Sequence, residues 1–146
     1  DSLEESVINL PIKKYKSSIE MISCSDELSA KDAFALMSAY SIVCLPIIDK
    51  QKNLISVISA TDSLYAGRNV DSLNWNVLEY LKESRFRTNG INYRSVDNII
   101  TCFLDNTIGY ILNLMIDENI HNVYIVSNDY KLLNVVTFTD ILQICL

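Results

Sequence analysis

Glycine, proline and histidine are scarce in this 146-residue sequence, which holds three, two and one of them respectively. So few glycines and prolines, in a chain that is 49% hydrophobic, argue against disorder, because enough apolar surface is present to offset chain ordering. The single histidine removes most catalytic dyads and histidine-rich metal sites from consideration. We therefore expect one globular domain, or two small repeats that share a core.

Positive charge and long apolar runs are also lacking. The net charge is −6, and an acidic surface gains nothing from releasing counterions around phosphates, so no nucleic-acid partner is expected. No apolar run approaches the roughly 20 residues that span a bilayer, and no signal-peptide pattern opens the chain. We expect a soluble protein with no membrane partner. A start at Asp1 instead of Met is what we expect of a fragment of a longer chain.

The four cysteines show no C-x-x-C spacing and stand in apolar surroundings. We interpret them as buried thiols in a reducing compartment, with a disulfide pair or a metal site as the alternatives. They are Cys24, Cys44, Cys102 and Cys145.

An internal repeat becomes visible when the sequence is shifted along itself by 78 residues. Residues 21–64 then align with residues 99–142 without a gap, and the aligned residues are identical at 11 of 44 positions. Each copy has the pattern β-α-β-β-α. A unit this small leaves one side of its sheet uncovered, so we predict an α/β fold in which the two copies pack sheet against sheet.

The pattern also predicts where the elements lie. We assign residues 1–20 to a lead-in segment, 21–66 to the first repeat, 67–98 to a connector and 99–146 to the second repeat. Helix N-caps are expected at Ser29 and Thr107. The opening strands are expected at Met21–Cys24 and Ile99–Phe103, and a connector helix at Trp75–Lys82 with Val77, Leu78 and Leu81 inward. The helical stripes expected to be buried are Ala33, Phe34, Leu36, Met37 and Tyr40, and Ile108, Ile111, Leu112, Met115 and Ile116.

A polar motif, [Ser/Thr]-x-x-Asp, recurs where the last strand of each copy ends and a helix begins. It runs from Ser59 to Asp62 and from Thr137 to Asp140. One interpretation is helix capping. The other is ligand binding, in which the carboxylate accepts hydrogen bonds from two ribose hydroxyls while the hydroxyl and helix end face a phosphate. The two interpretations are compatible.

Two basic clusters flank the repeats. One is Lys13-Lys14-Tyr15-Lys16, and the other, in the connector, holds Lys82, Arg85, Arg87 and Arg94. They are interpreted either as solvated surface charge or as the places where an acidic protein collects phosphates.

These residues resemble a known family. The sequence is similar to a tandem pair of cystathionine-β-synthase-type (CBS) domains, called a Bateman module. It resembles most of all the C-terminal half of the gamma subunit of AMP-activated protein kinase and its fungal counterpart. The stretches that carry the resemblance are Ile42–Asp49, Asp71–Leu81, Ile120–Val126 and Val136–Leu142. The resemblance implies a noncatalytic nucleotide-sensing module that binds AMP, ADP or ATP without a further cofactor. It also implies alpha-type catalytic and beta-type scaffold subunits as partners, a second Bateman module or a homodimer, and a cytoplasmic or also nuclear location.

The resemblance also implies roles for single residues. Asp62 and Asp140 would hold ribose, with Ser59 and Thr137 lining the same sites, and His121 and Arg85 would meet phosphate. Adenine would lie between Val43, Cys44, Val57, Ile99, Ile100 and Val135. Core packing is the alternative for these six apolar residues, and an ordinary surface position is the alternative for His121.

Two departures from the family pattern weaken the expected phosphate contacts. Asn122 follows His121 where the family has arginine, which removes a bidentate donor. The family threonine before this repeat pair is replaced around Lys13-Lys14-Tyr15, although the lysines could supply charge. The alternative function is therefore a structural scaffold for kinase subunit assembly, with degenerate and ligand-free sites. Catalysis is not expected, because no nucleophile–base pair, metal cluster or phosphate loop is present in the sequence.

Overall fold

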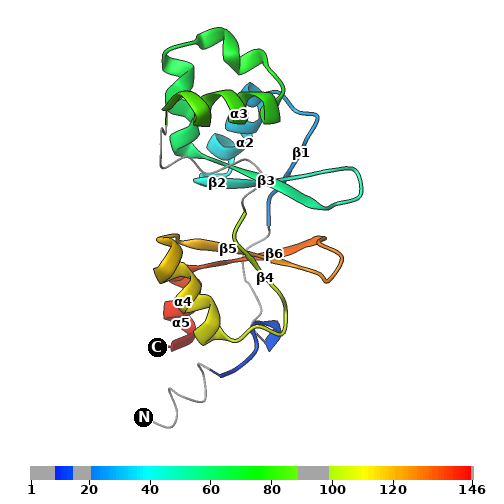
Figure 1. Ribbon diagram of the computed structural model, residues 1–146, viewed down its shortest axis with the longest axis vertical. Coiled ribbons are helices and arrows are strands. Elements are labelled where there is room, and N and C mark those ends of the chain that lie inside the picture. Colours follow the sequence, from blue (N-terminus) through cyan, green and yellow to red (C-terminus); the bar gives the residue numbers. More distant parts are fainter. Residues whose placement is uncertain (1–8, 15–20, 89–98, 146) are drawn as a thin grey trace. The chain divides into compact units, whose positions relative to one another are not determined.

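The computed structural model describes residues 9–14, 21–88 and 99–145 (Figure 1). The chain divides into two compact units, and each is treated separately. The first-repeat unit comprises the described residues from Ile22 to Ile99. The second-repeat unit comprises the described residues from Ile100 onward together with those up to Met21.

Each unit is built on a three-stranded mixed sheet. In the first-repeat unit the strand order is β1-β2-β3, with β1 parallel and β3 antiparallel to the central β2. Its elements are β1 (Cys24–Ser25), α2 (Ala30–Ala39), β2 (Cys44–Ile48), β3 (Leu54–Ser59), the 3-10 helices η2 (Ala60–Gly67) and η3 (Val70–Asn74), and α3 (Val77–Thr88). Figure 1 shows α2 and α3 on the same face of this sheet.

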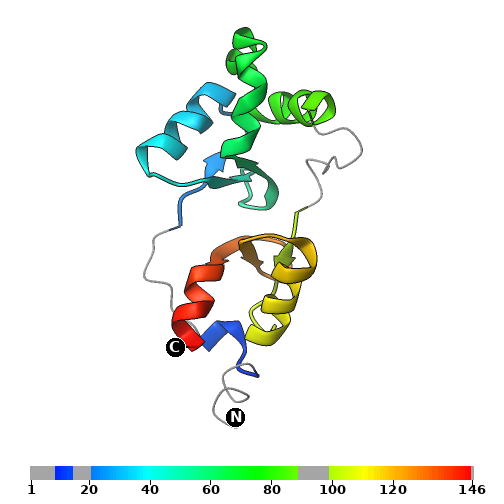
Figure 2. The ribbon, with the colours of Figure 1, turned by 90° about the vertical axis from the view of Figure 1, so that its left-hand side faces the viewer.

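The second-repeat unit has the same topology, with strand order β4-β5-β6. Its elements are η1 (Ile12–Lys14), β4 (Thr101–Cys102), α4 (Ile108–Glu118), β5 (Asn122–Val126), β6 (Leu132–Thr137) and α5 (Phe138–Cys145). In Figure 2 the yellow α4 and the red α5 lie beside the blue η1. The opening strands β1 and β4 are shorter than predicted.

The predicted repeat is confirmed in details of the backbone. The register of the antiparallel pair shifts at Ile47/Ile48 in one unit and at Ile125/Val126, 78 residues later, in the other. Left-handed backbone also recurs at this offset: φ is 55° at Ser41 and 53° at Asn119, and 69° at both Lys52 and Tyr130. The two copies therefore share chain geometry at positions where their residue types differ.

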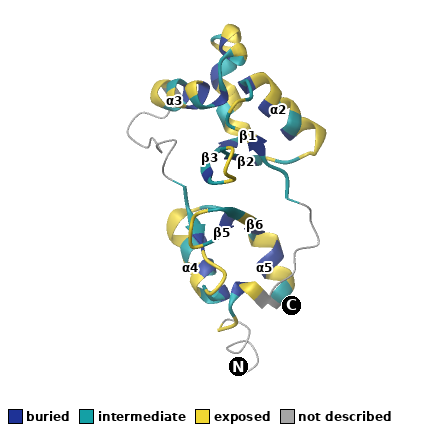
Figure 3. Cartoon of the chain, turned by 90° about the vertical axis from the view of Figure 1, so that its right-hand side faces the viewer, coloured by how far each residue is buried: buried dark blue, intermediate teal, exposed yellow. Residues whose placement is uncertain are grey.

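The helix caps are confirmed, and the burial of the helical stripes is confirmed in part. The Ser29 hydroxyl accepts a hydrogen bond from the Asp32 N–H at 3.1 Å, and Thr107 accepts one from the Tyr110 N–H at 3.1 Å. One narrow stripe is buried in each helix, namely Ala30, Ala33 and Met37 in α2 and Ile108, Ile111 and Met115 in α4. Figure 3 shows buried and exposed residues on different sides of these helices.

The prediction of burial was wrong for Tyr40 and Ile116, which are 55% and 69% exposed. Tyr40 lies beyond the last turn of α2, which ends at Ala39. Ile116 follows Met115 directly and therefore projects about 100° away from the buried stripe.

The lead-in segment packs on the second repeat, although it precedes the first in sequence. The Ile12 N–H donates to the Asn106 carbonyl at 2.8 Å, and the Lys13 N–H donates to the Leu104 carbonyl at 3.0 Å. The Ile12 side chain is 1% exposed and belongs to the core of the second-repeat unit. The second repeat thus completes its core with residues from the other end of the chain.

The connector helix α3 completes the core of the first-repeat unit. Val77 and Leu81 are fully buried and Leu78 is partly buried against the same core, as predicted. The helix continues to Thr88, six residues beyond the predicted end at Lys82. Tyr80, which the sequence did not single out, is fully buried and donates its hydroxyl to the Asp62 carbonyl at 2.5 Å. This bond fixes α3 against the start of η2.

A buried hydroxyl on β3 lacks a partner among the described residues. Ser56 is fully buried, and its Oγ makes no hydrogen bond to this part of the chain. An unsatisfied buried polar group costs about 1–3 kcal/mol in desolvation. We expect Ser56→Ala to raise the free energy of unfolding by about 1 kcal/mol in urea titrations. Ser63→Ala is the control, because the exposed Ser63 hydroxyl donates to the Ala60 carbonyl at 2.6 Å, and its loss should lower stability slightly. Equal changes in both variants would contradict this account.

No helix among the described residues has both the length and the apolar character needed to cross a bilayer.

Candidate functional site

The first copy of the repeated motif is closed by an ion pair. Asp62 Oδ2 accepts hydrogen bonds from the Ser59 N–H at 2.8 Å and from the Ser59 hydroxyl at 3.0 Å. Arg85, on α3, donates from Nε to Oδ1 at 3.2 Å and from Nη2 to Oδ2 at 3.1 Å. The two charged side chains are only 12% (Arg85) and 8% (Asp62) exposed. Both carboxylate oxygens of Asp62 are therefore already bonded.

Arg85 also binds the edge of the sheet. Its Nη2 donates to the Val57 carbonyl at 2.6 Å. β3 is the edge strand of its sheet. Along an antiparallel strand, residues whose backbone groups point towards the neighbouring strand alternate with residues whose backbone groups point away. Because the Ala60 N–H donates to the Val43 carbonyl, the Val57 carbonyl, three residues earlier, points away from β2. The guanidinium thus satisfies an edge-strand carbonyl and a buried carboxylate together.

The second copy of the motif forms a reciprocal capping box at the start of α5. The Thr137 N–H donates to Asp140 Oδ2 at 2.9 Å, and the Asp140 N–H donates to Thr137 Oγ1 at 3.0 Å. The capping interpretation is therefore confirmed here. Asp140 is 6% exposed. Within the described residues, none of the ion pairs involves Asp140.

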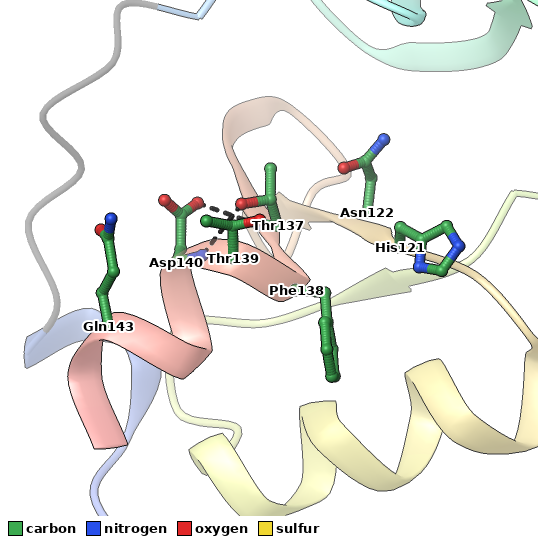
Figure 4. A pocket seen from close by; sticks show the side chains of 7 residues that line it. All are labelled: His121, Asn122, Thr137, Phe138, Thr139, Asp140 and Gln143. Carbon is green, nitrogen blue, oxygen red and sulfur yellow. Dashed lines mark hydrogen bonds between the residues drawn. The ribbon is translucent and has the colours of Figure 1, made fainter. Parts of the chain in front are cut away.

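A pocket of about 500 Å³ adjoins this second motif (Figure 4). In Figure 4 Asp140 and Thr137 are joined by the capping hydrogen bonds, and His121 and Asn122 project from the start of β5. The exposed His121 is anchored through its carbonyl, which accepts a hydrogen bond from the Phe138 N–H at 2.8 Å. The pocket is lined by His121, Asn122, Thr137, Phe138, Thr139, Asp140 and Gln143. It therefore combines a carboxylate, hydroxyls and an imidazole within one unit.

The six apolar residues predicted to hold adenine lie outside both hydrophobic cores. Val43 is 66% exposed, and the other five are half-buried: Cys44, Val57, Ile99, Ile100 and Val135. Neither core cluster includes any of the six. On β3, Val57 and Ser59 lie on the face opposite the buried Leu54, Ser56 and Ile58. The six residues thus lie outside the core of each unit, while their contact with adenine and their packing in a core shared by the two repeats both stay predictions.

The comparison with protein families decides the identity of the repeated unit. A CBS domain profile matches residues 12–62 and 94–146. The chain belongs to the CBS domain family. The predicted fold class, an α/β pair of CBS repeats, is confirmed by this match and by the two three-stranded sheets.

Curated relatives fall into two kinds. The chain is 27% identical over 134 residues to the SNF1-related protein kinase regulatory subunit gamma-1-like of Arabidopsis thaliana, covering 88% of this chain and 30% of that protein. It is 22% identical over 143 residues to the 5′-AMP-activated protein kinase subunit gamma-3 of Sus scrofa, covering 97% and 26%. It is 24% identical over 131 residues to the inosine-5′-monophosphate dehydrogenase of Pasteurella multocida (strain Pm70), covering 88% and 24%. The chain thus spans between 24% and 30% of the length of these relatives.

Solved CBS structures share the fold. The CBS domain pair of protein MJ0100, in complex with 5′-methylthioadenosine and S-adenosyl-L-methionine, superposes with a TM-score of 0.68 at 21% identity, covering 92% of this chain and 94% of that one. A CBS domain protein from Pyrobaculum aerophilum complexed with AMP gives a TM-score of 0.69 at 14% identity, covering 90% and 89%.

Most of the described basic side chains that flank the CBS repeats are paired. Lys13 bonds Asp105 at 2.8 Å, Arg87 bonds Glu83 at 2.7 Å and Arg85 bonds Asp62, while Lys82 is exposed. The side chain of Lys14, together with Tyr15, Lys16 and Arg94, lies outside the described residues. Arg85 is paired with Asp62 in the structure, and its role toward phosphate stays a prediction.

Two polar residues of the pocket beside Asp140 were not among the predicted site residues. Thr139 is identical to Thr61 in the repeat alignment, so the repeat itself carried a signal for it. Gln143 follows Asp140 by three residues on α5, and helical spacing would have placed the two on one face. Among the described residues, no group of three or more His, Cys, Asp and Glu side chains could hold a metal ion.

Two of the cysteines occupy equivalent buried positions in the CBS cores. Cys24 and Cys102 are 3% and 1% exposed, as predicted, whereas Cys44 is only half-buried and the Cys145 side chain lies outside the described residues. Burial raises the pKa of Cys24 to about 11 and the pKa of Cys102 to about 12. Both thiols therefore stay protonated in the folded protein well above the ordinary pKa of about 8.5.

Stability should consequently fall in alkali. Each thiol holds its proton more tightly in the folded than in the unfolded chain, so its contribution is fully present below pH 8.5 and is lost as pH rises towards about 11 to 12. We expect the free energy of unfolding, measured in urea between pH 8 and 11, to decline above pH 9. The decline should be shallower when Cys24 and Cys102 are both replaced by Ala. An identical slope in that variant would contradict the assignment.

Proposed function

We propose that this chain is a noncatalytic regulatory module that binds an adenine nucleotide, with its better-formed site at the second CBS repeat. The observation that carries the proposal is the contrast between the two motif aspartates. The Asp62 carboxylate is ion-paired with Arg85, which donates two hydrogen bonds to it. Asp140 instead accepts a hydrogen bond at Oδ2 in the capping box and forms no ion pair among the described residues. A carboxylate in a polar pocket suits the two vicinal hydroxyls of a ribose.

The remaining groups of the pocket suit the rest of a nucleotide. Thr137 and Thr139 supply hydroxyls at the start of α5, where the helix dipole favours a phosphate. His121 stands at the rim and would donate to the same phosphate, but Asn122 beside it supplies no charge. The half-buried apolar residues Ile100 and Val135 would contact the adenine ring. The adenosine-containing ligands named for the two structural neighbours support this ligand class.

The kinase assignment rests on similarity to two gamma-type subunits. We propose that the chain is part of such a subunit and that it assembles in the cytoplasm, or also the nucleus, with an alpha-type catalytic and a beta-type scaffold subunit. Nucleotide occupancy would then bias the contacts within that complex. The charge at the pocket rim would determine which of AMP, ADP and ATP binds with the highest affinity.

The test is calorimetric titration of the chain with AMP, ADP and ATP. We expect Asp140→Ala to weaken binding of the preferred nucleotide at least about tenfold, because a charge-assisted hydrogen bond contributes about 1.5–3 kcal/mol. Asp117→Ala is the matched control, since Asp117 is an exposed acidic residue of α4 in the same unit. Unchanged affinity in Asp140→Ala, or no heat with any nucleotide, would refute the proposed site.

The scaffold alternative is favoured by one observation, the saturated Asp62 carboxylate of the first repeat. In a pure scaffold, neither motif aspartate would affect ligand binding, and the kinase subunits would bind equally with and without nucleotide. Pull-down of alpha- and beta-type subunits by the wild-type and Asp140→Ala chains, each with and without AMP, separates the two functions. A nucleotide effect that disappears in Asp140→Ala supports regulation.

A further inference from the structure

The Asp62–Arg85 ion pair occupies the two groups that a nucleotide would need at the first repeat. Asp62 is the predicted ribose acceptor, and Arg85 is a predicted phosphate donor. Here they neutralise each other through two hydrogen bonds of 3.1 and 3.2 Å, with both side chains almost buried. Neither charge is available to a ligand while the pair is closed.

We propose that Arg85 gates the first-repeat site, so that the site admits nucleoside phosphates and excludes nucleosides. This inference rests on the proposed function, because it assumes that the motif aspartates bind ribose. A nucleotide replaces both halves of the ion pair at once. Its phosphate accepts hydrogen bonds from the Arg85 guanidinium, and its ribose hydroxyls donate to the Asp62 carboxylate.

A nucleoside can make only one of these replacements. Its hydroxyls can bond Asp62, but Arg85 then loses its carboxylate and gains nothing in return. The Arg85 side chain is only 12% exposed, so an unpaired charge there is strongly unfavourable. The ion pair therefore selects for ligands that carry a phosphate, and this selection is absent at Asp140, which has no ion-pair partner among the described residues.

Opening the gate also changes how α3 is held. Arg85 joins α3 to the η2 start through Asp62 and to the β3 edge through the Val57 carbonyl. The hydroxyl of Tyr80, five residues earlier on α3, keeps its own bond to the Asp62 carbonyl. Ligand entry should therefore loosen the C-terminal half of α3, beyond Leu81, while its buried N-terminal half stays packed. The site would in this way report its occupancy through the connector helix.

The test uses the full chain carrying Asp140→Ala, which removes the second-repeat site, and compares AMP with adenosine by calorimetry. We expect AMP to bind at least tenfold more tightly than adenosine. Adding Arg85→Met should bring the two affinities to within about threefold, because adenosine no longer breaks an ion pair and AMP loses a phosphate donor. Arg87→Met, which removes an exposed arginine of the same helix, should leave the preference unchanged.

Hydrogen exchange supplies a readout that does not need the Arg85 variant to fold. In the Asp140→Ala chain, AMP should accelerate amide exchange in α3 beyond Leu81, and adenosine should not. The gate is refuted if AMP and adenosine bind this chain equally, if neither binds, or if AMP leaves α3 exchange unchanged. The wild-type chain, titrated with AMP in parallel, separates the two failures. If the proposed function fails, the wild type gives no heat or binds AMP no more tightly than the Asp140→Ala chain, whereas failure of the gate alone leaves the tighter binding of AMP by the wild type intact.

Discussion

Replacing Arg85 by Met is expected to lower the free energy of unfolding of the first-repeat unit by about 3 kcal/mol, because it leaves the Asp62 carboxylate buried without a countercharge. Asp62 is only 8% exposed on its side chain, and two of its four hydrogen bonds come from Arg85. Methionine keeps the apolar stem of the side chain, so the loss measures the charge and not the packing. Urea unfolding followed by the fluorescence of Trp75, the chain's single tryptophan, checks the prediction.

Two further variants isolate the ion pair as the cause. Adding Asp62→Asn to Arg85→Met should recover at least half of the loss, since the buried charge is then gone. Arg87→Met is the matched control: it lies two residues later on α3, and its ion pair with Glu83 is exposed. We expect Arg87→Met to leave the free energy of unfolding nearly unchanged. Equal losses for Arg85→Met and Arg87→Met would show that the Asp62 pair does not stabilise the fold.

Ile12→Ala is expected to lower the free energy of unfolding of the second-repeat unit by about 3 kcal/mol. The Ile12 side chain is 1% exposed and lies in a core with Ile108 and Ile111, so truncation leaves a cavity. The first-repeat unit should be unaffected, because Ile12 is not part of its core. Amide exchange of α4 should therefore accelerate while the Trp75 unfolding transition stays in place.

Leu10→Ala serves as the control for the lead-in segment. Leu10 is 41% exposed, yet its carbonyl accepts the Ile108 N–H at 3.0 Å, a backbone bond that the substitution keeps. We expect Leu10→Ala to cost less than about 1 kcal/mol. If Ile12→Ala shifted the Trp75 transition instead of α4 exchange, the assignment of the lead-in segment to the second repeat would be wrong.

The [Ser/Thr]-x-x-Asp motif occurs in both units, but its aspartate has different partners in each. Both copies place an aspartate three residues after a hydroxyl residue, and both hold the carboxylate by the N–H of that residue, at 2.8 Å for Ser59 and 2.9 Å for Thr137. Only the first copy receives Arg85. The two sites should therefore differ in ligand preference, with a phosphate required at the first repeat and the sugar and base contributing relatively more at the second.

Features encoded by near neighbours could be predicted from the sequence. The caps at Ser29 and Thr107 and the capping box at Asp140 depend on hydrogen bonds between residues three apart. The repeat offset of 78 could be predicted because it needs only a comparison of the sequence with itself. The opening strands were predicted too long, because each pairs over only two residues with its neighbour. The prediction that Tyr40 and Ile116 are buried was wrong for a similar reason. The end of a helix and the width of its buried stripe depend on which other elements pack against that helix.

The sequence by itself therefore determined the two CBS repeats, the strand-helix-strand-strand-helix order that both follow, and the motif aspartates, although the last helix of the first repeat is the 3-10 helix η2. Tertiary structure alone decided which motif aspartate is ion-paired and which segment of the chain completes each hydrophobic core. Arg85 reaches Asp62 across 23 residues, and Lys13 reaches Asp105 across 92. Such contacts leave no local period or spacing in the sequence, because they depend on where separate elements meet once the apolar faces have packed.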